Sequence, residues 1–71
     1  MTQTIQLLDV VALLESLPDR GMIAGQVGTV VEIHEAGVFE VEFSDNSGRT
    51  YASLALPEGK IIALHYDPIA A

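Results

Sequence analysis

The sequence predicts a small all-β domain of about five strands, on two observations. Turn signals rich in glycine and proline recur at Pro18 to Gly21, Gly25, Ser44 to Gly48 and Pro57 to Gly59, and they leave short pieces of chain between them. Residues Val38 to Phe43 place their two aromatic rings and one valine on one side and two glutamates on the other. This two-residue period is typical of a strand with one buried face.

The stretch Glu35 to Gly37 predicts how the two central strands pair. We expect a three-residue hairpin loop with Gly37 in the left-handed conformation. His34 then faces Val38, and the further pairs match in type: Ile33–Phe39, Glu32–Glu40 and Val31–Val41. A two-residue loop would place Ile33 opposite Glu40 and is rejected. On this register Val31 points into the core.

The stretch Asp45 to Gly48 predicts a second hairpin. A four-residue turn there gives the pairs Phe43–Thr50, Glu42–Tyr51, Val41–Ala52, Glu40–Ser53 and Phe39–Leu54. Three strands then form a meander, and a shorter strand follows the "PEG" turn; the expected ranges are Val27 to His34, Val38 to Ser44, Arg49 to Leu56, and Ile61 to Tyr66.

The first segment is ambiguous by period. A helical stripe would contain Leu7, Val10, Val11, Leu14 and Leu17, whereas the β-branched pair Val10-Val11 suits a strand. A twisted meander needs a further element to cover its apolar face, so we interpret "DVVALL" as a strand followed by a long loop.

Length, composition and charge limit the classes of function. At 71 residues the chain is predicted to be one domain, residues 1–71, and a homodimer is as reasonable an expectation as a monomer because 49% of the residues are hydrophobic. Three basic residues against ten acidic ones give a formal net charge of −7, which disfavours nucleic acid and anionic membranes and favours a basic protein partner. The chain has no cysteine and no signal-peptide pattern, so a cytoplasmic location is expected.

Two resemblances follow from these stretches. "GQVGTVVEIHEAGVFEVEF" resembles the small SH3-like barrels of the KOW type through Gly25, Gly28 and Val30. From Leu7 to Pro68, "LLDVVALLESLP", "GQVGTVVE", "FEVEFSDNSGRTYASLAL" and "LHYDP" resemble the small bacterial family catalogued as domain of unknown function number forty-nine twenty-six. The resemblance implies an SH3-like barrel with a long loop after the first strand. It implies no activity, cofactor or catalytic residue.

The predicted register places an acidic surface on the outside of the sheet. Glu32, Glu40 and Ser53 form one outward row, and the neighbouring row consists of Val30, Glu42 and Tyr51. Facing glutamates repel each other unless a counter-charge lies between them, and lysine or arginine from a partner would supply one. The alternative is a solvated face kept charged to prevent aggregation. Tyr51 is either a contact anchor or a cover for its own sheet.

The long loop offers a second candidate surface. By analogy with other SH3-like barrels, Leu17 to Ile23 would line an interface through Met22 and Ile23. The alternative is that these side chains only cover the core.

No residue pattern predicts catalysis, a cofactor or a metal. His34 has Glu32 and Glu35 nearby, but one imidazole and two carboxylates make a poor zinc signature, and we interpret His34 as a surface residue at a strand end. The sequence therefore favours a non-enzymatic protein-interaction module that binds a basic partner, in the manner of an antitoxin, immunity protein or adaptor. The alternatives are a KOW-like module associated with RNA or the ribosome, and a self-assembling structural domain.

Overall fold

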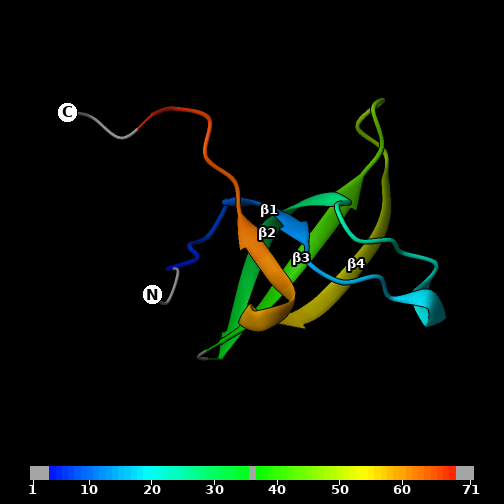
Figure 1. Cartoon of the computed structure of the whole chain (residues 1–71), viewed down its shortest axis with the longest axis horizontal. Helices are drawn as coiled ribbons and strands as arrows, with labels where there is room; N and C mark the ends of the chain where they lie inside the picture. The colour runs from blue at the N-terminus through cyan, green and yellow to red at the C-terminus, as the bar shows by residue number, and fades with distance from the viewer. Residues whose placement is uncertain (1–3, 36, 69–71) are drawn as a thin grey trace.

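The computed structural model describes residues 4–35 and 37–68, which fold as an all-β domain (Figure 1). Five strands and two single turns of 3₁₀ helix follow one another along the chain. They are β1 (Val10–Leu13), η1 (Pro18–Arg20), β2 (Val27–Glu35), β3 (Val38–Ser44), β4 (Thr50–Pro57), η2 (Glu58–Lys60) and β5 (Ile61–Ala63). The predicted fold class is confirmed, including the long loop between the first two strands. The last strand is shorter than predicted and ends at Ala63.

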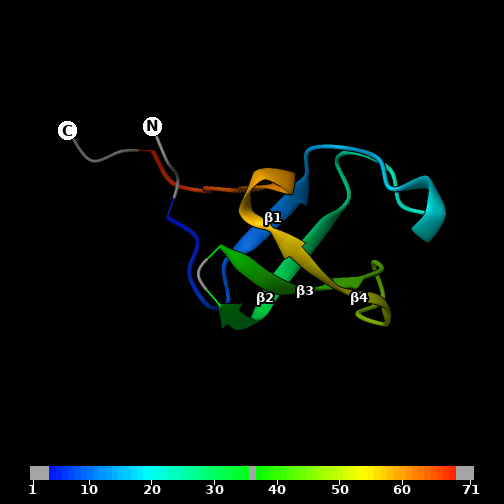
Figure 2. The same cartoon turned by 90° about the horizontal axis from the view of Figure 1, so that it is seen from below.

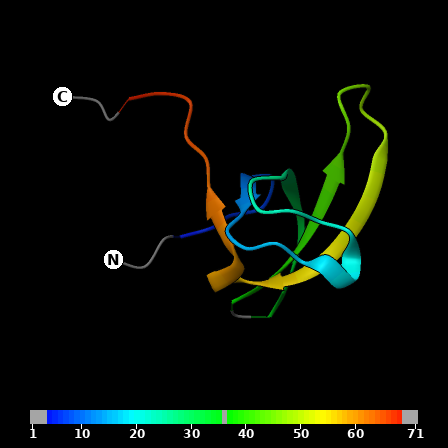
Figure 3. The ribbon, with the colours of Figure 1, turned by 45° about the vertical axis from the view of Figure 1, so that its right-hand side comes forward.

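All five strands belong to one antiparallel sheet in the order β4-β3-β2-β1-β5. The sheet curls (Figure 2), and β5 and β4 lie at its opposite margins. The loop after β1 crosses in front of the sheet between these two strands in Figure 3. The buried side chains of all five strands form a single cluster inside this curl, together with Ile5 and Met22. This architecture is compatible with an SH3-like barrel.

The ambiguous first segment is a strand, as predicted, because it pairs on both sides. Val11 faces Gly28 of β2 and Ala63 of β5, and Leu13 faces Ile61. Val11 and Leu13 are buried on the inner face of the sheet. Two leucines of the helical stripe, Leu7 and Leu14, remain about half exposed. The strand conformation buries the alternate residues, whereas a helix would have lost both ladders of hydrogen bonds.

The hairpin between β2 and β3 has the predicted pairing in its middle and different pairings on both sides. Next to the turn, Val38 faces Glu35 instead of His34, so the expectation of a three-residue loop that begins at Glu35 was wrong. Glu35 belongs to β2, and a register shift between Ile33 and Glu35 takes up the extra residue. Ile33 faces Phe39 and Glu32 faces Glu40, as expected. Gly37 has a φ of 82°, which fits the left-handed position predicted for it. Ala36, the middle residue of the predicted loop, lies outside the described residues.

A β-bulge then changes which valine of β2 is buried. The register shifts between Val30 and Glu32, so Val41 faces Val30 instead of Val31. Val30 is completely buried, whereas Val31 keeps 39% of its surface exposed. The expectation that Val31 points into the core was therefore wrong, because the bulge inserts one residue and reverses the side-chain alternation before it.

The hairpin between β3 and β4 keeps the predicted inner face but slides by two residues. Phe39 faces Leu56, Val41 faces Leu54 and Phe43 faces Ala52. The predicted partners of these residues lay two positions earlier in the chain. The bulge beside Phe43 accounts for one residue of the slide, and the turn accounts for the other, because Ser44 faces Thr50 and not Arg49 as a four-residue turn would require. The Asp45 carboxylate closes this turn by accepting hydrogen bonds from the backbone N–H groups of Ser47 and Arg49.

The two glycines of the "GQVG" stretch have different structural reasons. Gly25 has a φ of 94°, a left-handed conformation that side chains rarely adopt. Gly28 leaves space for its neighbours, since a Cβ added there would lie 2.6 Å from Val41 Cγ1 and 2.9 Å from Phe43 Cδ2. Gly25 is therefore required by the backbone conformation of the turn, and Gly28 by the close approach of β2 and β3.

Candidate functional site

The convex side of the sheet carries three of the predicted binding residues, Glu32, Glu40 and Glu42. The strand registers and the alternation of side chains place ten residues on it, which we call the outer face: Val10, Ala12, Val27, Thr29, Glu32, Glu40, Glu42, Ser53, Ala55 and Ile62. Its part over β2 and β3 contains Glu32, Glu40 and Glu42, and we call it the acidic half. Its part over β1, β2 and β5 contains Val10, Ala12, Val27 and Ile62, and we call it the apolar half.

The facing glutamates of the acidic half hold a histidine between them. His34 Nε2 donates to Glu40 Oε1 at 2.7 Å, and His34 Nδ1 lies 3.9 Å from Glu32 Oε2. Ser53 Oγ donates to the other oxygen of Glu40 at 2.6 Å. Sequence reasoning anticipated a counter-charge between Glu32 and Glu40 but did not assign it to His34, whose position results from a second irregularity of β2, between Ile33 and Glu35.

These contacts shift the titration of both partners. The hydrogen bond to Glu40 is the main reason that the pKa of His34 is raised above its ordinary 6.5, and the charges of Glu32, Glu40 and Glu35 act in the same direction. The hydrogen bonds from His34 and then from Ser53 lower the pKa of Glu40 below its ordinary 4.5. Protonated His34 therefore screens the repulsion between the two glutamates, and this screening fades as the pH rises through the raised pKa of His34.

The same geometry does not form a metal site. Glu32 and Glu40 approach opposite nitrogens of the His34 ring, so the three groups do not converge on one point. Among residues 4–35 and 37–68, no three His, Cys, Asp or Glu side chains are grouped closely enough to hold a metal ion.

Glu42 lies on the outer face as predicted, but its neighbours differ from those expected. It faces Thr29 on β2 and Ser53 on β4. Val30, expected beside it, is in the core, and Tyr51 lies elsewhere. The Tyr51 ring is 6.4 Å from that of the buried Phe43, and its hydroxyl accepts a hydrogen bond of 3.0 Å from Gln26 Nε2. The two-residue slide of β4 removes Tyr51 from the acidic half.

The two candidates in the long loop are separated by the structure. Met22 is 3% exposed and packs in the core cluster, so the expectation that it lines an interface is corrected. Its backbone pairs with Leu17 across the loop, which turns its side chain inward. Ile23 is 65% exposed and remains accessible.

The apolar half was not predicted from the sequence. Ala12 faces Val27 on one side and Ile62 on the other, and the two larger side chains are each nearly half exposed. The alternation within "VVAL" and "IIA" carries only a weak signal for it, because most residues in these strands are apolar on both faces. Pairing of β1 between β2 and β5 brings the three residues into one row.

Fold and surface together define a small all-β domain whose curled sheet presents a half-acidic, half-apolar outer face. The model of the family described as "Domain of unknown function (DUF4926)" matches residues 7–63 of the 71, and the chain belongs to this family. Neither the curated proteins nor the solved structures contain a match to the chain. In the part of the chain that the structure describes, no helix is long and apolar enough to cross a membrane.

Proposed function

We propose that the chain is a non-enzymatic protein-interaction module whose outer face binds a basic partner. The observation that supports this most directly is the juxtaposition of three carboxylates with exposed apolar side chains on one continuous sheet surface. Binding surfaces of proteins commonly combine an apolar area with charged groups around it.

The charge distribution favours a cation from outside the chain. The three basic residues all lie outside the strands: Arg20 in η1, Arg49 before β4, and Lys60 in η2, where its Nζ lies 2.9 Å from Glu15 Oε1. Among residues 4–35 and 37–68, His34 is the one cationic side chain that makes an ion pair with the acidic half. A lysine or arginine from a partner would relieve the repulsion that remains between Glu32 and Glu40, and the net charge of −7 would accelerate the encounter.

The apolar half would supply the affinity that surface charges alone provide weakly. Exposed ion pairs contribute about 0–1 kcal/mol each, whereas buried apolar surface contributes about 25 cal/mol per Å². A partner that covers Val27 and Ile62 while its cations reach the acidic half would combine both effects. Antitoxins, immunity proteins and adaptors act by such stoichiometric binding.

Affinity capture from a lysate of the source organism tests the proposal. We compare the immobilised native chain with Glu32→Gln/Glu42→Gln, which removes two charges and leaves the His34–Glu40 contact in place. Asp67→Asn, at an exposed position beyond β5, is the control for lost charge elsewhere. We expect one basic protein to be retained by the native chain and by the control, and to be lost with the double variant or at high salt.

Four results would contradict the proposal. Capture that is insensitive to salt, or equal for the double variant, would exclude recognition by the acidic half. Failure to retain any protein would leave the interaction without support. Binding of mixed RNA at low salt, measured by fluorescence anisotropy, would favour the KOW-like alternative instead.

A further inference from the structure

Strand β4 has a free edge with unusual chemistry. It is the outermost strand of the sheet, and within the described part of the chain it pairs with β3 on one side only. Its sequence, "TYASLALP", contains no charged residue. Exposed edge strands are usually protected by lysines, prolines or bulges, because their unpaired N–H and C=O groups attract other strands. In β4 such protection is confined to the ends, at the bulge near Tyr51 and at Pro57.

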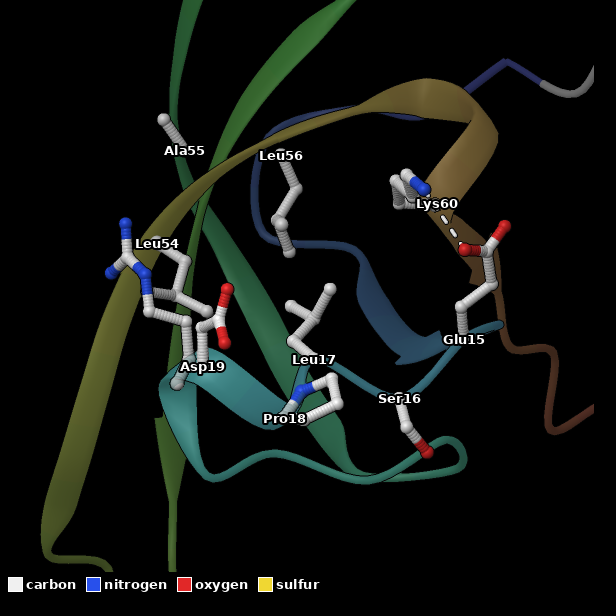
Figure 4. Close-up of a pocket in the computed structure, with 10 residues that line it drawn as sticks. Glu15, Ser16, Leu17, Pro18, Asp19, Leu54, Ala55, Leu56 and Lys60 are labelled. Atoms are coloured by element: carbon white, nitrogen blue, oxygen red, sulfur yellow. Dashed lines mark hydrogen bonds and ion pairs between the residues drawn. The ribbon is translucent and has the colours of Figure 1, made fainter.

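A cavity of about 380 Å³ lies between the middle of this strand and the loop after β1. Leu54 and Leu56 of β4 point into it from one side, and Leu17 and Pro18 lie opposite them (Figure 4). The ion pair between Glu15 and Lys60 lies at one end of the cavity (Figure 4). Asp19 and Arg20 also line it, so its two acidic and two basic residues balance. We call the free edge and this cavity together the β4 slot.

We propose that the β4 slot binds an extended, predominantly apolar segment of a partner protein, which adds a strand to β4. The backbone of the segment would pair with the free edge, and every second side chain would point toward the interior of the curl. One such side chain, of the size of leucine or phenylalanine, would enter the cavity against Leu17, Leu54 and Leu56. This site is separate from the acidic and apolar halves of the outer face.

A second copy of the chain fits the slot less well than a segment of another protein. The inner side chains of β4 in a second copy, Ala52, Leu54 and Leu56, already pack in that copy's own core. They would extend the sheet but could not fill the cavity. A segment that is not part of a folded sheet can contribute both its backbone and its side chains.

The charge balance of the slot also separates it from the acidic half. No excess of carboxylates lines the slot, so a basic segment gains nothing there from electrostatics. Binding in the slot is therefore expected to persist at high salt, because apolar contacts and backbone hydrogen bonds are not weakened by ionic screening.

Selection from a random peptide library displayed on phage, at high salt, provides the probe. The peptide that is enriched is then synthesised and titrated into the ¹⁵N-labelled chain. Ala55→Lys places a charge on the exposed middle of β4, and Ser47→Lys places the same charge on the β3–β4 turn as the control. Leu17→Gln is the second variant, which changes the cavity wall without touching β4.

We expect enriched peptides with apolar residues at alternate positions and amide shifts that concentrate on β4 and on residues 15–20. Ala55→Lys and Leu17→Gln should each weaken the peptide at least tenfold, and Ser47→Lys should not. The proposal is overturned if no sequence is enriched, if the shifts map to the acidic or apolar half of the outer face, or if both slot variants bind normally. It is also overturned if light scattering shows a dimer of the native chain that Ala55→Lys dissociates, since a second copy would then occupy the edge.

Discussion

Replacing Gly28 with alanine adds one methyl group at a point where β2 and β3 approach closely. The new Cβ would lie 2.6 Å from Val41 Cγ1 and 2.9 Å from both Phe43 Cδ2 and the carbonyl oxygen of Glu42, whereas carbon atoms pack at about 3.5–4.0 Å. Val41 and Phe43 are fully buried and have no free space to move into. The contact with Glu42 involves the backbone, so it can be relieved only if the two strands separate.

The expected loss follows from two opposing effects. Overpacking of a core costs about 1–3 kcal/mol, and the lower flexibility of alanine in the unfolded chain offsets about 0.4–1 kcal/mol of this. We therefore expect Gly28→Ala to lower the free energy of unfolding by about 1–2 kcal/mol, out of about 4–10 kcal/mol for a chain of 71 residues.

Urea unfolding followed by far-UV circular dichroism measures this loss. The matched control is Gly59→Ala in η2, where a Cβ would meet nothing within 4 Å. The control should be as stable as the native chain or slightly more stable. An unchanged unfolding midpoint for Gly28→Ala, or an equal loss in both variants, would refute the close-packing argument.

Two further predictions concern the bulge and the histidine contact. Val30→Asp should prevent folding, because it buries an unpaired carboxylate, whereas Val31→Asp should change the free energy of unfolding by only about 0.5 kcal/mol; equal unfolding midpoints in urea would contradict the bulge. In an NMR titration, Glu40→Gln should lower the pKa of His34 toward 6.5 and Glu42→Gln should leave it raised; equal pKa values in the two variants would exclude the Glu40 contact as its cause. The raised pKa of His34 contributes stability that is fully present below pH 6.5 and is lost as the pH rises through the raised pKa. The lowered pKa of Glu40 contributes stability that is fully present above pH 4.5 and is lost as the pH falls through the lowered pKa. The native chain should therefore exceed Glu40→Gln in urea midpoint most clearly between these two pH values, and a difference independent of pH would contradict the linkage.

The pairing of β2 with β3 was predictable only in the middle of the hairpin, since register shifts on both sides of Ile33 and Glu32 change the pairs next to the turn and beyond Glu32. Gly37 and the alternation beside it place Ile33 opposite Phe39, as the structure confirms. The bulge that follows has no local signature, because Val30 and Val31 are identical in type and adjacent. Which of them is buried is decided by the packing of the whole core, and the sequence pattern contains no information about it.

The error in the pairing of β3 with β4 has a different origin. A slide of two residues keeps every side chain on its own face, so the apolar residues remain inside on either register. The predicted buried set, including Leu54, was therefore compatible with both pairings. The error changed the neighbours on the outer face: Tyr51 was predicted to face Glu42, but Ser53 faces it.

The charged residues of the candidate site were predictable from the sequence, but the apolar half of the outer face was not. Alternation alone indicated that Glu40 and Glu42 point outward, since they share strand β3 with buried aromatic residues. The apolar half depends on pairing between β1 and β5, which are about fifty residues apart in the sequence. Met22 was misplaced because the residue types in the loop do not show that its backbone pairs with Leu17, which turns the Met22 side chain inward.

The bulge at Val31 also has an evolutionary consequence. It divides β2 into a proximal stretch, whose Val30 is committed to the core, and a distal stretch from Glu32 to Glu35, whose side chains are all exposed. Substitutions in the distal stretch alter the charge and shape of the surface but leave the packing of the core unchanged. Relatives of this protein can therefore diversify that end of the sheet while inheriting one stable scaffold, and the sequence variation among them should change abruptly at the bulge.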